Sequence, residues 1–230
     1  MELRLHEVHE VAALKQFIKF FKINCVFDVG ANTGQYAKML REKVGYTGDI
    51  LSFEPFSQAF RELSKNSSND THWHVFNNAI SNETGERLLN LVSSSQMNSL
   101  ETPSTDETEL LCRYNTLVGS EKVNLVSLDE IFEKIMKKTV NFRPLLKLDT
   151  QGHDLTILKG SRLLSNFYGV QAEISFKSLY HGAPKYHETI NYLEQAGFEL
   201  TAIFPNNAGH FPYLIEQDIL AFNSSCLSTA

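Results

Sequence analysis

The sequence has few cysteines and no long apolar run. Its three cysteines, Cys25, Cys112 and Cys226, are widely separated and do not form a CxxC spacing. They therefore support neither a disulfide framework nor a zinc knuckle. The apolar runs are a few residues long, far below the roughly 18 that span a bilayer, and the N-terminus lacks the basic-then-apolar pattern of a signal peptide. These absences predict a soluble, cytoplasmic protein with reduced thiols and no membrane partner.

Positive charge is also scarce. The 230-residue chain has 21 Lys and Arg against 27 Asp and Glu, a formal net charge of -6, and shows no basic patch along the sequence. This balance disfavours a nucleic acid partner. The apolar content of 42% is ordinary for a globular protein, and the length fits a single domain over residues 1–230 with a modest insertion.

Short apolar runs alternate with helical patterns along most of the chain. An amphipathic helix is expected within residues 1–23, because apolar residues recur there at steps of three and four. Predicted strands follow at residues 25–29, 50–53, 72–76, 144–148 and 168–172. Further helices are predicted at residues 36–40, 58–65, 128–137, 155–164 and 186–195. The pattern predicts an α/β fold with a mainly parallel twisted sheet, helices on both faces, and a closing antiparallel hairpin of residues 198–204 and 213–222.

The alternation breaks between residues 86 and 126. Two predicted strands, 87–92 and 122–126, enclose a polar segment at 93–120 that is rich in Ser, Thr and Glu. A segment of this length inside a compact domain is typical of either a functional lid or a disordered insertion, and both readings stay open. The tail at 223–230 is expected to be frayed.

Polar or glycine residues stand at the carboxyl ends of the predicted strands. They are Asp28 with Gly30 and Gly34, Glu54, Asp149 and Glu173. In an open parallel sheet, ligands bind outside these strand ends, so the residues are expected to share one crevice. The glycines let the backbone turn tightly beside a helix N-terminus. Glu54 lies 20 residues after Gly34, which suits an acid that binds both hydroxyls of a ribose.

The glycine loop differs from the dinucleotide-binding pattern GxGxxG. That pattern needs glycine at positions 30, 32 and 35, where this chain has Gly30, Asn32 and Gln35. Asp28 would repel a pyrophosphate, whereas it would attract an α-ammonium group. The loop therefore favours a zwitterionic amino-acid cofactor such as S-adenosylmethionine over NAD.

Six ordered segments resemble the FkbM-type S-adenosylmethionine-dependent methyltransferases. They are VFDVGANTGQY at 26–36, LSFEPF at 51–56, NNAIS at 77–81, VSLDEI at 126–131, LLKLDTQGHDLTILKG at 145–160 and LYHGAP at 179–184. The resemblance covers nearly the whole chain from about Val26 to Phe222. It implies a Rossmann-like methyltransferase fold and O-methylation of a hydroxyl on a saccharide or glycosylated small molecule.

The resemblance also implies where the cofactor binds. The cofactor loop falls on Asp28, Gly30, Ala31, Asn32 and Gly34, and the ribose-binding acid on Glu54. Phe56 would flank the adenine, and Asn78 would lie beside the adenine edge.

Three residues are expected to act on the acceptor. Methyl transfer to an alcohol needs alignment of the hydroxyl and removal of its proton, and Asp149, His153 and Glu173 are the candidates. His153 is the best general base by its intrinsic pKa. The alternative readings are a helix N-cap for Asp149, a surface position for His153 and a lysine partner for Glu173. Many relatives have Glu-Gly-x-Glu after the aspartate, where this chain has QGHD at 151–154.

A metal ion is not expected. Asp149 and Glu173, with His153 or His181, could supply ligands, but no pair of these residues has a diagnostic spacing. Two other functions stay open on the same type of sheet. One is an NAD-dependent oxidoreductase or sugar epimerase, and the other is a binding module that holds S-adenosylmethionine without catalysis.

Overall fold

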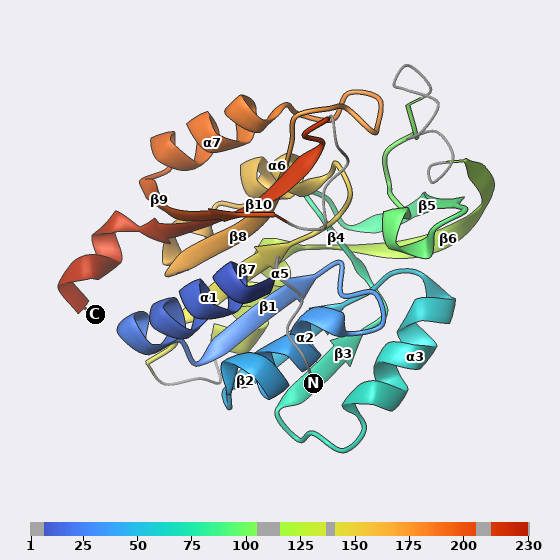
Figure 1. Cartoon of the computed structure of the whole chain (residues 1–230). Helices are drawn as coiled ribbons and strands as arrows, with labels where there is room; N and C mark the ends of the chain where they lie inside the picture. The colour runs from blue at the N-terminus through green and yellow to red at the C-terminus, as the bar shows by residue number, and fades with distance from the viewer. Residues whose placement is uncertain (1–6, 105–115, 137–140, 206–212, 230) are drawn as a thin grey trace.

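A seven-stranded sheet forms the centre of the protein. This computed structural model describes residues 7–104, 116–136, 141–205 and 213–229 (Figure 1). The strands are β1 (Cys25–Val29), β2 (Asp49–Phe53), β3 (Trp73–Phe76), β7 (Pro144–Leu148), β8 (Gly169–Ser175), β9 (Phe198–Phe204) and β10 (Glu216–Asn223). Their order is β3-β2-β1-β7-β8-β10-β9, with β10 antiparallel to both of its neighbours and the other pairs parallel. The predicted parallel sheet and closing antiparallel pair are confirmed.

Helices cover both faces of this sheet. One face carries α1 (Glu7–Phe21), α2 (Gln35–Met39) with its π-helical continuation η1 (Leu40–Val44), and α3 (Ser57–Ser67). The other face carries α5 (Leu128–Met136), α6 (Asp154–Gly160) and α7 (Tyr186–Gln195). Short 3-10 turns are η2 (Ser95–Met97), η3 (Leu164–Asn166) and η4 (Ser224–Thr229). The predicted doubly covered α/β fold is therefore confirmed.

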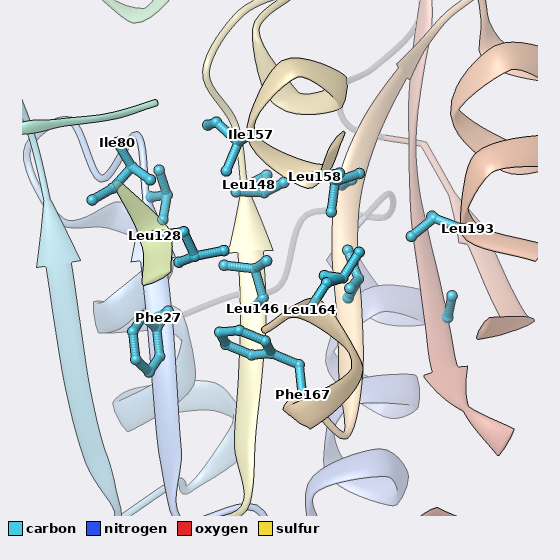
Figure 2. Close-up of a cluster of buried hydrophobic side chains, with 14 of the residues drawn as sticks. Phe27, Ile80, Leu128, Leu146, Leu148, Ile157, Leu158, Leu164, Phe167 and Leu193 are labelled. Carbon is cyan, nitrogen blue, oxygen red and sulfur yellow. The ribbon is translucent and has the colours of Figure 1, made fainter. Parts of the chain in front are cut away.

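Strand alternation divides the core into two layers. In β1, Phe27 and Val29 join the cluster under α5 and α6, while Val26 joins the cluster under α1 and α2. Figure 2 shows the first cluster, in which Phe27 and Leu146 lie on the sheet near Leu128 of α5. Successive strand residues point to opposite faces, so the continuous apolar runs of the sequence serve both layers.

A second, three-stranded sheet holds the inserted segment. It consists of β4 (Ala79–Ser81), β5 (Gly85–Val92) and β6 (Leu117–Ser127), in the order β4-β6-β5. The antiparallel pair of β5 and β6 matches the predicted hairpin, and β4 adds a parallel strand that was not predicted. We call residues 94–104 the strap. Of the rest of the predicted lid, residues 117–120 belong to β6, and residues 105–115 lie outside the described residues.

Several predicted boundaries were wrong. The strand predicted at 122–126 runs over Leu117–Ser127 as β6, because it pairs with β5 along most of that length. The helix predicted to reach residue 164 stops at Gly160, because the following Ser161 is extended and its hydroxyl donates to Asp129. β8 runs past Glu173 to Ser175, because β10 pairs along it and places Asp218 opposite Glu173.

The tail predicted to fray at 223–230 instead contributes Asn223 to β10 and forms η4. The Asn223 side chain donates to the carbonyls of Ser165 and Phe167, which holds the start of the tail. Among the described helices, none is long and apolar enough to cross a membrane.

Candidate functional site

A cavity of about 640 Å³ opens at the carboxyl edge of the main sheet. The loops after β1, β2 and β7 line it, together with β8, the start of β10, part of α1 and the strap. Its carboxyl groups belong to Glu7, Glu10, Glu54, Asp149, Glu173, Glu216 and Asp218. The volume lies within the roughly 300–1,000 Å³ of small-molecule and cofactor sites. The cavity also lies where ligands bind in open α/β sheets.

The loop after β1 needs glycine at its first turn. Gly30 has a φ of +81°, and a Cβ on it would lie 1.9 Å from the backbone oxygen of Asp149. The Gly30 and Ala31 amides both donate to the Phe53 carbonyl at 3.0 Å. The loop is therefore pressed between the ends of β2 and β7, with Gly30, Ala31 and Asn32 lining the cavity.

Glu54 is held by backbone donors at the start of the next loop. Its Oε2 accepts from the Asn32 amide and its Oε1 from the Phe56 amide, each at 2.8 Å. Burial raises the pKa of Glu54 to about 7, although these two hydrogen bonds oppose the shift. Each carboxylate oxygen can accept a second hydrogen bond. Glu54 and Asn78 both line the cavity, so they are placed to meet a nucleoside.

Asp28 meets the cavity through Lys147 rather than directly. Asp28 is fully buried and is not part of the described lining. Ser52 donates to its Oδ2 at 2.8 Å, while Oδ1 has no hydrogen-bond partner in the described structure and lies 3.9 Å from Lys147 Nζ. Burial raises the pKa of Asp28, and the Lys147 charge opposes that shift. This position differs from the direct contact with an α-ammonium group that the sequence suggests.

The Asp149 carboxylate is held on both oxygens. Lys147 Nζ lies 3.0 Å from Oδ2, and Gln151 Nε2 donates to Oδ1 at 2.9 Å. Burial opposes ionisation of Lys147, but the carboxylates of Asp149 and Asp28 outweigh it and raise the pKa of Lys147. The ammonium is therefore retained, and it also lies 5.2 Å from the centre of the Tyr36 ring.

Further carboxyl groups face Asp149 across the cavity. Burial and the neighbouring charges of Glu216 and Asp149 raise the pKa of Glu173 well above its usual value. Burial likewise raises the pKa of Glu216 to about 8, with Asp149 adding to the effect. The pKa of Asp218 is raised by burial and by Glu10. This side of the cavity thus combines hydrogen-bonding groups with carboxyls that bind protons more strongly than usual.

The strap closes over the cavity and is tied down on both sides. Its residues 94–100 are part of the lining. Ser99 Oγ donates to the Gln151 carbonyl at 2.6 Å, and the Tyr180 hydroxyl lies 2.7 Å from the Met97 carbonyl. The His181 amide donates to the Thr102 carbonyl at 2.8 Å. The described part of the predicted lid is therefore an anchored cover.

His153 is not brought together with Asp149 and Glu173. It is 1% exposed and absent from the described lining. Its Nδ1 lies 2.7 Å from Glu101 Oε1, and its Nε2 lies 3.0 Å from Ser81 Oγ. Because both ring nitrogens are engaged, this histidine links the strap to β4 and α6. The hydrogen bond from His153 lowers the pKa of Glu101.

Two predicted cofactor residues also lie outside the described lining. Phe56 packs against the apolar cluster of the small sheet, which includes Leu89 and Leu100. Gly34 precedes α2 with a φ of +90°, and a Cβ there would lie 2.6 Å from the Trp73 ring. Gly34 thus lets the loop pack on Trp73 of β3.

Lys147, Gln151, Glu10 and Gln171 were missed as site residues. The sequence does contain a signal for Lys147, because it is the one cation in the apolar run PLLKL and lies two residues before Asp149. Residues two apart on a strand point to the same face, so the two side chains are expected to meet. Gln171 donates to Glu10 at 2.8 Å. That contact depends on how α1 packs against the sheet, and the packing of α1 cannot be predicted from the local sequence pattern. Among the described residues, no group of three or more His, Cys, Asp or Glu side chains is arranged to hold a metal ion.

The fold and the site define a class of protein. A mainly parallel, doubly covered sheet with an antiparallel β10, a glycine turn after β1 and an acid after β2 together make a Rossmann-like site for a nucleoside cofactor. The family model described as "Methyltransferase FkbM domain" matches residues 28–200. The chain therefore belongs to the FkbM family of S-adenosylmethionine-dependent methyltransferases.

Solved structures share this fold at low sequence identity. An FkbM methyltransferase from Methylobacillus flagellatus KT is similar with a TM-score of 0.50 and 15% identity, over 87% of this chain and 43% of that chain. This chain thus spans less than half of that protein. An rRNA methylase from Streptococcus thermophilus is similar with a TM-score of 0.50 and 8% identity, over 97% of this chain and 99% of that chain. No curated protein matches the sequence.

Proposed function

We propose that this chain transfers a methyl group from S-adenosylmethionine to a hydroxyl of a saccharide or glycosylated small molecule. One observation carries the proposal. At the strand ends beside the glycine loop, one cavity carboxylate, Asp149, lies 3.0 Å from the ammonium of Lys147, and burial raises the pKa of a second, Glu173. Two acids with such different surroundings suit different tasks in one reaction.

The residues on the β1 and β2 side of the cavity fit the cofactor. Glu54 presents oxygens to the ribose hydroxyls, Asn78 offers an amide to the base, and the Gly30 turn lets the loop lie directly against the end of β7 beside the cavity. The carboxylate of Asp149 suits the positive charge of a sulfonium. When bound, S-adenosylmethionine supplies an electrophilic methyl group.

The residues on the β8 and β10 side fit an acceptor rich in hydroxyls. Glu10, Gln171, Glu216 and Asp218 line this side and offer carboxyl and carboxamide groups. In its ionised form, Glu173 would accept the hydroxyl proton as the acceptor oxygen takes the methyl group, and the sulfur of the donor would leave with the bonding electron pair. Asp149, which Lys147 and Gln151 hold in place, orients the acceptor. Glu173 replaces His153 as the proposed base, because its raised pKa makes it a better proton acceptor than an ordinary carboxylate.

The charge of the cavity argues against a nucleic acid acceptor. Its described lining has seven carboxyl side chains and one ammonium, that of Lys147. This lining offers a phosphate backbone a single cation to neutralise it. The widely separated cysteines of the sequence favour the reducing cytoplasm as the place of action.

An acceptor screen tests the proposal. The protein is incubated with S-adenosylmethionine labelled in the methyl group and with a panel of neutral sugars, glycosides, amino sugars, phenols and a structured RNA. We expect label in a saccharide, and loss of that label in the Glu54→Ala variant. Label confined to RNA or to phenols, or no transfer to any saccharide, would overturn the assigned acceptor class.

A further inference from the structure

Gln151 lies between the two carboxyl groups that the proposed reaction uses. Its Nε2 donates to Asp149 Oδ1 at 2.9 Å and lies 3.2 Å from Glu173 Oε2. A carboxamide nitrogen carries two N–H groups, so it can serve both acids at once. Without a donor between them, two nearby carboxylates repel each other, and one of them takes up a proton.

The orientation of this amide is fixed from its other end. Gln151 Oε1 lies 3.0 Å from the Tyr180 hydroxyl, and that hydroxyl lies 2.7 Å from the Met97 carbonyl of the strap. The single proton of the Tyr180 hydroxyl is shared between Gln151 Oε1 and the Met97 carbonyl, and the amide nitrogen faces two acids. The opposite orientation of the amide would place its oxygen against both carboxyl groups.

The backbone of Gln151 is also constrained by the strap. Its φ of 55° lies in the left-handed region, which is costly for a residue other than glycine and persists where the surroundings hold it in place. The Gln151 carbonyl accepts from Ser99 Oγ at 2.6 Å. The strap therefore contacts both the backbone and, through Tyr180, the side chain of this residue.

We propose that Gln151 is a positioning residue whose amide holds Asp149 and Glu173 in their working places, and that the strap sets this amide through Ser99 and Tyr180. The proposal rests on the proposed function, since it concerns the same two acids. It makes the ionised fraction of Glu173 depend on a closed strap. A displaced strap would release the amide and raise the pKa of Glu173 further, so less of the ionised base would be present and methyl transfer would be favoured in a covered cavity.

Two substitutions of similar side-chain length distinguish the effect of the Gln151 amide from the effect of its left-handed backbone. Gln151→Met removes both N–H donors, and Gln151→Glu replaces them with a third carboxylate. Both replacements are unbranched, so each incurs a similar cost at positive φ. Loss of the donor removes a hydrogen bond that favours ionised Glu173, so its pKa must rise, and the added charge of Gln151→Glu must raise it further.

The readout is the side-chain carboxyl signal of Glu173. Protein labelled with 13C at glutamate Cδ is titrated by NMR in the presence of S-adenosylhomocysteine, and the signal is assigned with Glu173→Gln. We expect the midpoint to rise by about one pH unit in Gln151→Met and by more in Gln151→Glu. Tyr180→Phe should shift it in the same direction by less. Tyr192→Phe is the control, because that hydroxyl donates to the Leu158 carbonyl and should not affect the signal.

The outcomes distinguish this inference from the proposed function. An unchanged Glu173 midpoint in both Gln151 variants overturns the positioning role. If those variants do not fold, an unchanged midpoint in Tyr180→Phe overturns it instead. Failure of the wild type to bind S-adenosylhomocysteine would contradict the proposed function. Bound product with a shifted Glu173 signal supports both.

Discussion

The ammonium of Lys147 lies 3.0 Å from the carboxylate of Asp149 inside the sheet edge, where the lysine side chain is 8% exposed. Lys147 also pairs in register with Asp28 on β1, at 3.9 Å between Nζ and Oδ1. One cation therefore serves the acids at two neighbouring strand ends. This link joins the cofactor side of the cavity to its acceptor side.

Replacing Lys147 by Met should destabilise the fold strongly. The side chain keeps its length and apolar stem, but Asp28 and Asp149 lose their shared cation. Breaking a buried ion pair on one side costs about 3–5 kcal/mol, which urea unfolding measures directly. Lys65→Met is the control, since Lys65 is exposed and pairs with Glu62 on the surface. Asp28 is the buried acid of the two, since the Asp149 side chain is 40% exposed. A loss below about 1 kcal/mol would show that Asp28 is neutral without Lys147.

Alanine substitutions at Gly30 and Gly45 distinguish the cost of a left-handed backbone from the cost of a steric clash, because the two glycines have nearly the same φ. Gly30 and Gly45 have φ values of +81° and +80°, but a Cβ on Gly45 has nothing within 4 Å. Gly45→Ala should cost about 1–2 kcal/mol for the left-handed conformation alone. Gly30→Ala should cost more and abolish binding of S-adenosylhomocysteine, because the loop must move off Asp149. Equal unfolding free energies for the two variants would contradict the close packing of these loops.

The strand ends were predictable, whereas the contacts between them were not. Strand alternation and the polar residues after each run predicted that Glu54 and Asp149 share one edge, and both line the cavity. The pairing of Lys147 with Asp28 needs the order of β1 and β7 in the sheet, which a local pattern does not contain. The prediction that His153 acts as the general base rested on the intrinsic pKa of histidine, which does not indicate whether the side chain is buried and hydrogen-bonded.

His153 should stabilise the strap rather than act on the acceptor. His153→Phe keeps a ring but loses the contacts with Glu101 and Ser81, so hydrogen exchange at the strap amides should quicken by about tenfold. Binding of S-adenosylhomocysteine should change by less than about threefold. His74→Phe, at an exposed position of β3, is the control. Unchanged strap exchange combined with lost methyl transfer would return His153 to a catalytic role.

Cofactor affinity should fall as the pH drops below about 7. The pKa of Glu54 is raised to about 7 in the free protein, and ribose hydroxyls donate to the ionised form, so binding must lower that pKa. Binding at lower pH must then release a proton, and the affinity should fall by up to about tenfold per pH unit. Calorimetric titration with S-adenosylhomocysteine, in buffers of different ionisation enthalpy and at several pH values, measures both the proton release and the affinity. Glu54→Gln should bind without this release, and a release that persists there would assign it to another group.

Calorimetric titration with S-adenosylhomocysteine and, separately, with NAD tests the central claim most directly. We predict that one S-adenosylhomocysteine binds per chain, that NAD does not bind, and that Glu54→Ala weakens the binding by about 1–3 kcal/mol through lost hydrogen bonds. Glu62→Ala, on the exposed face of α3, should bind like the wild type. Binding of NAD without binding of S-adenosylhomocysteine would contradict the account and favour an oxidoreductase on the same sheet.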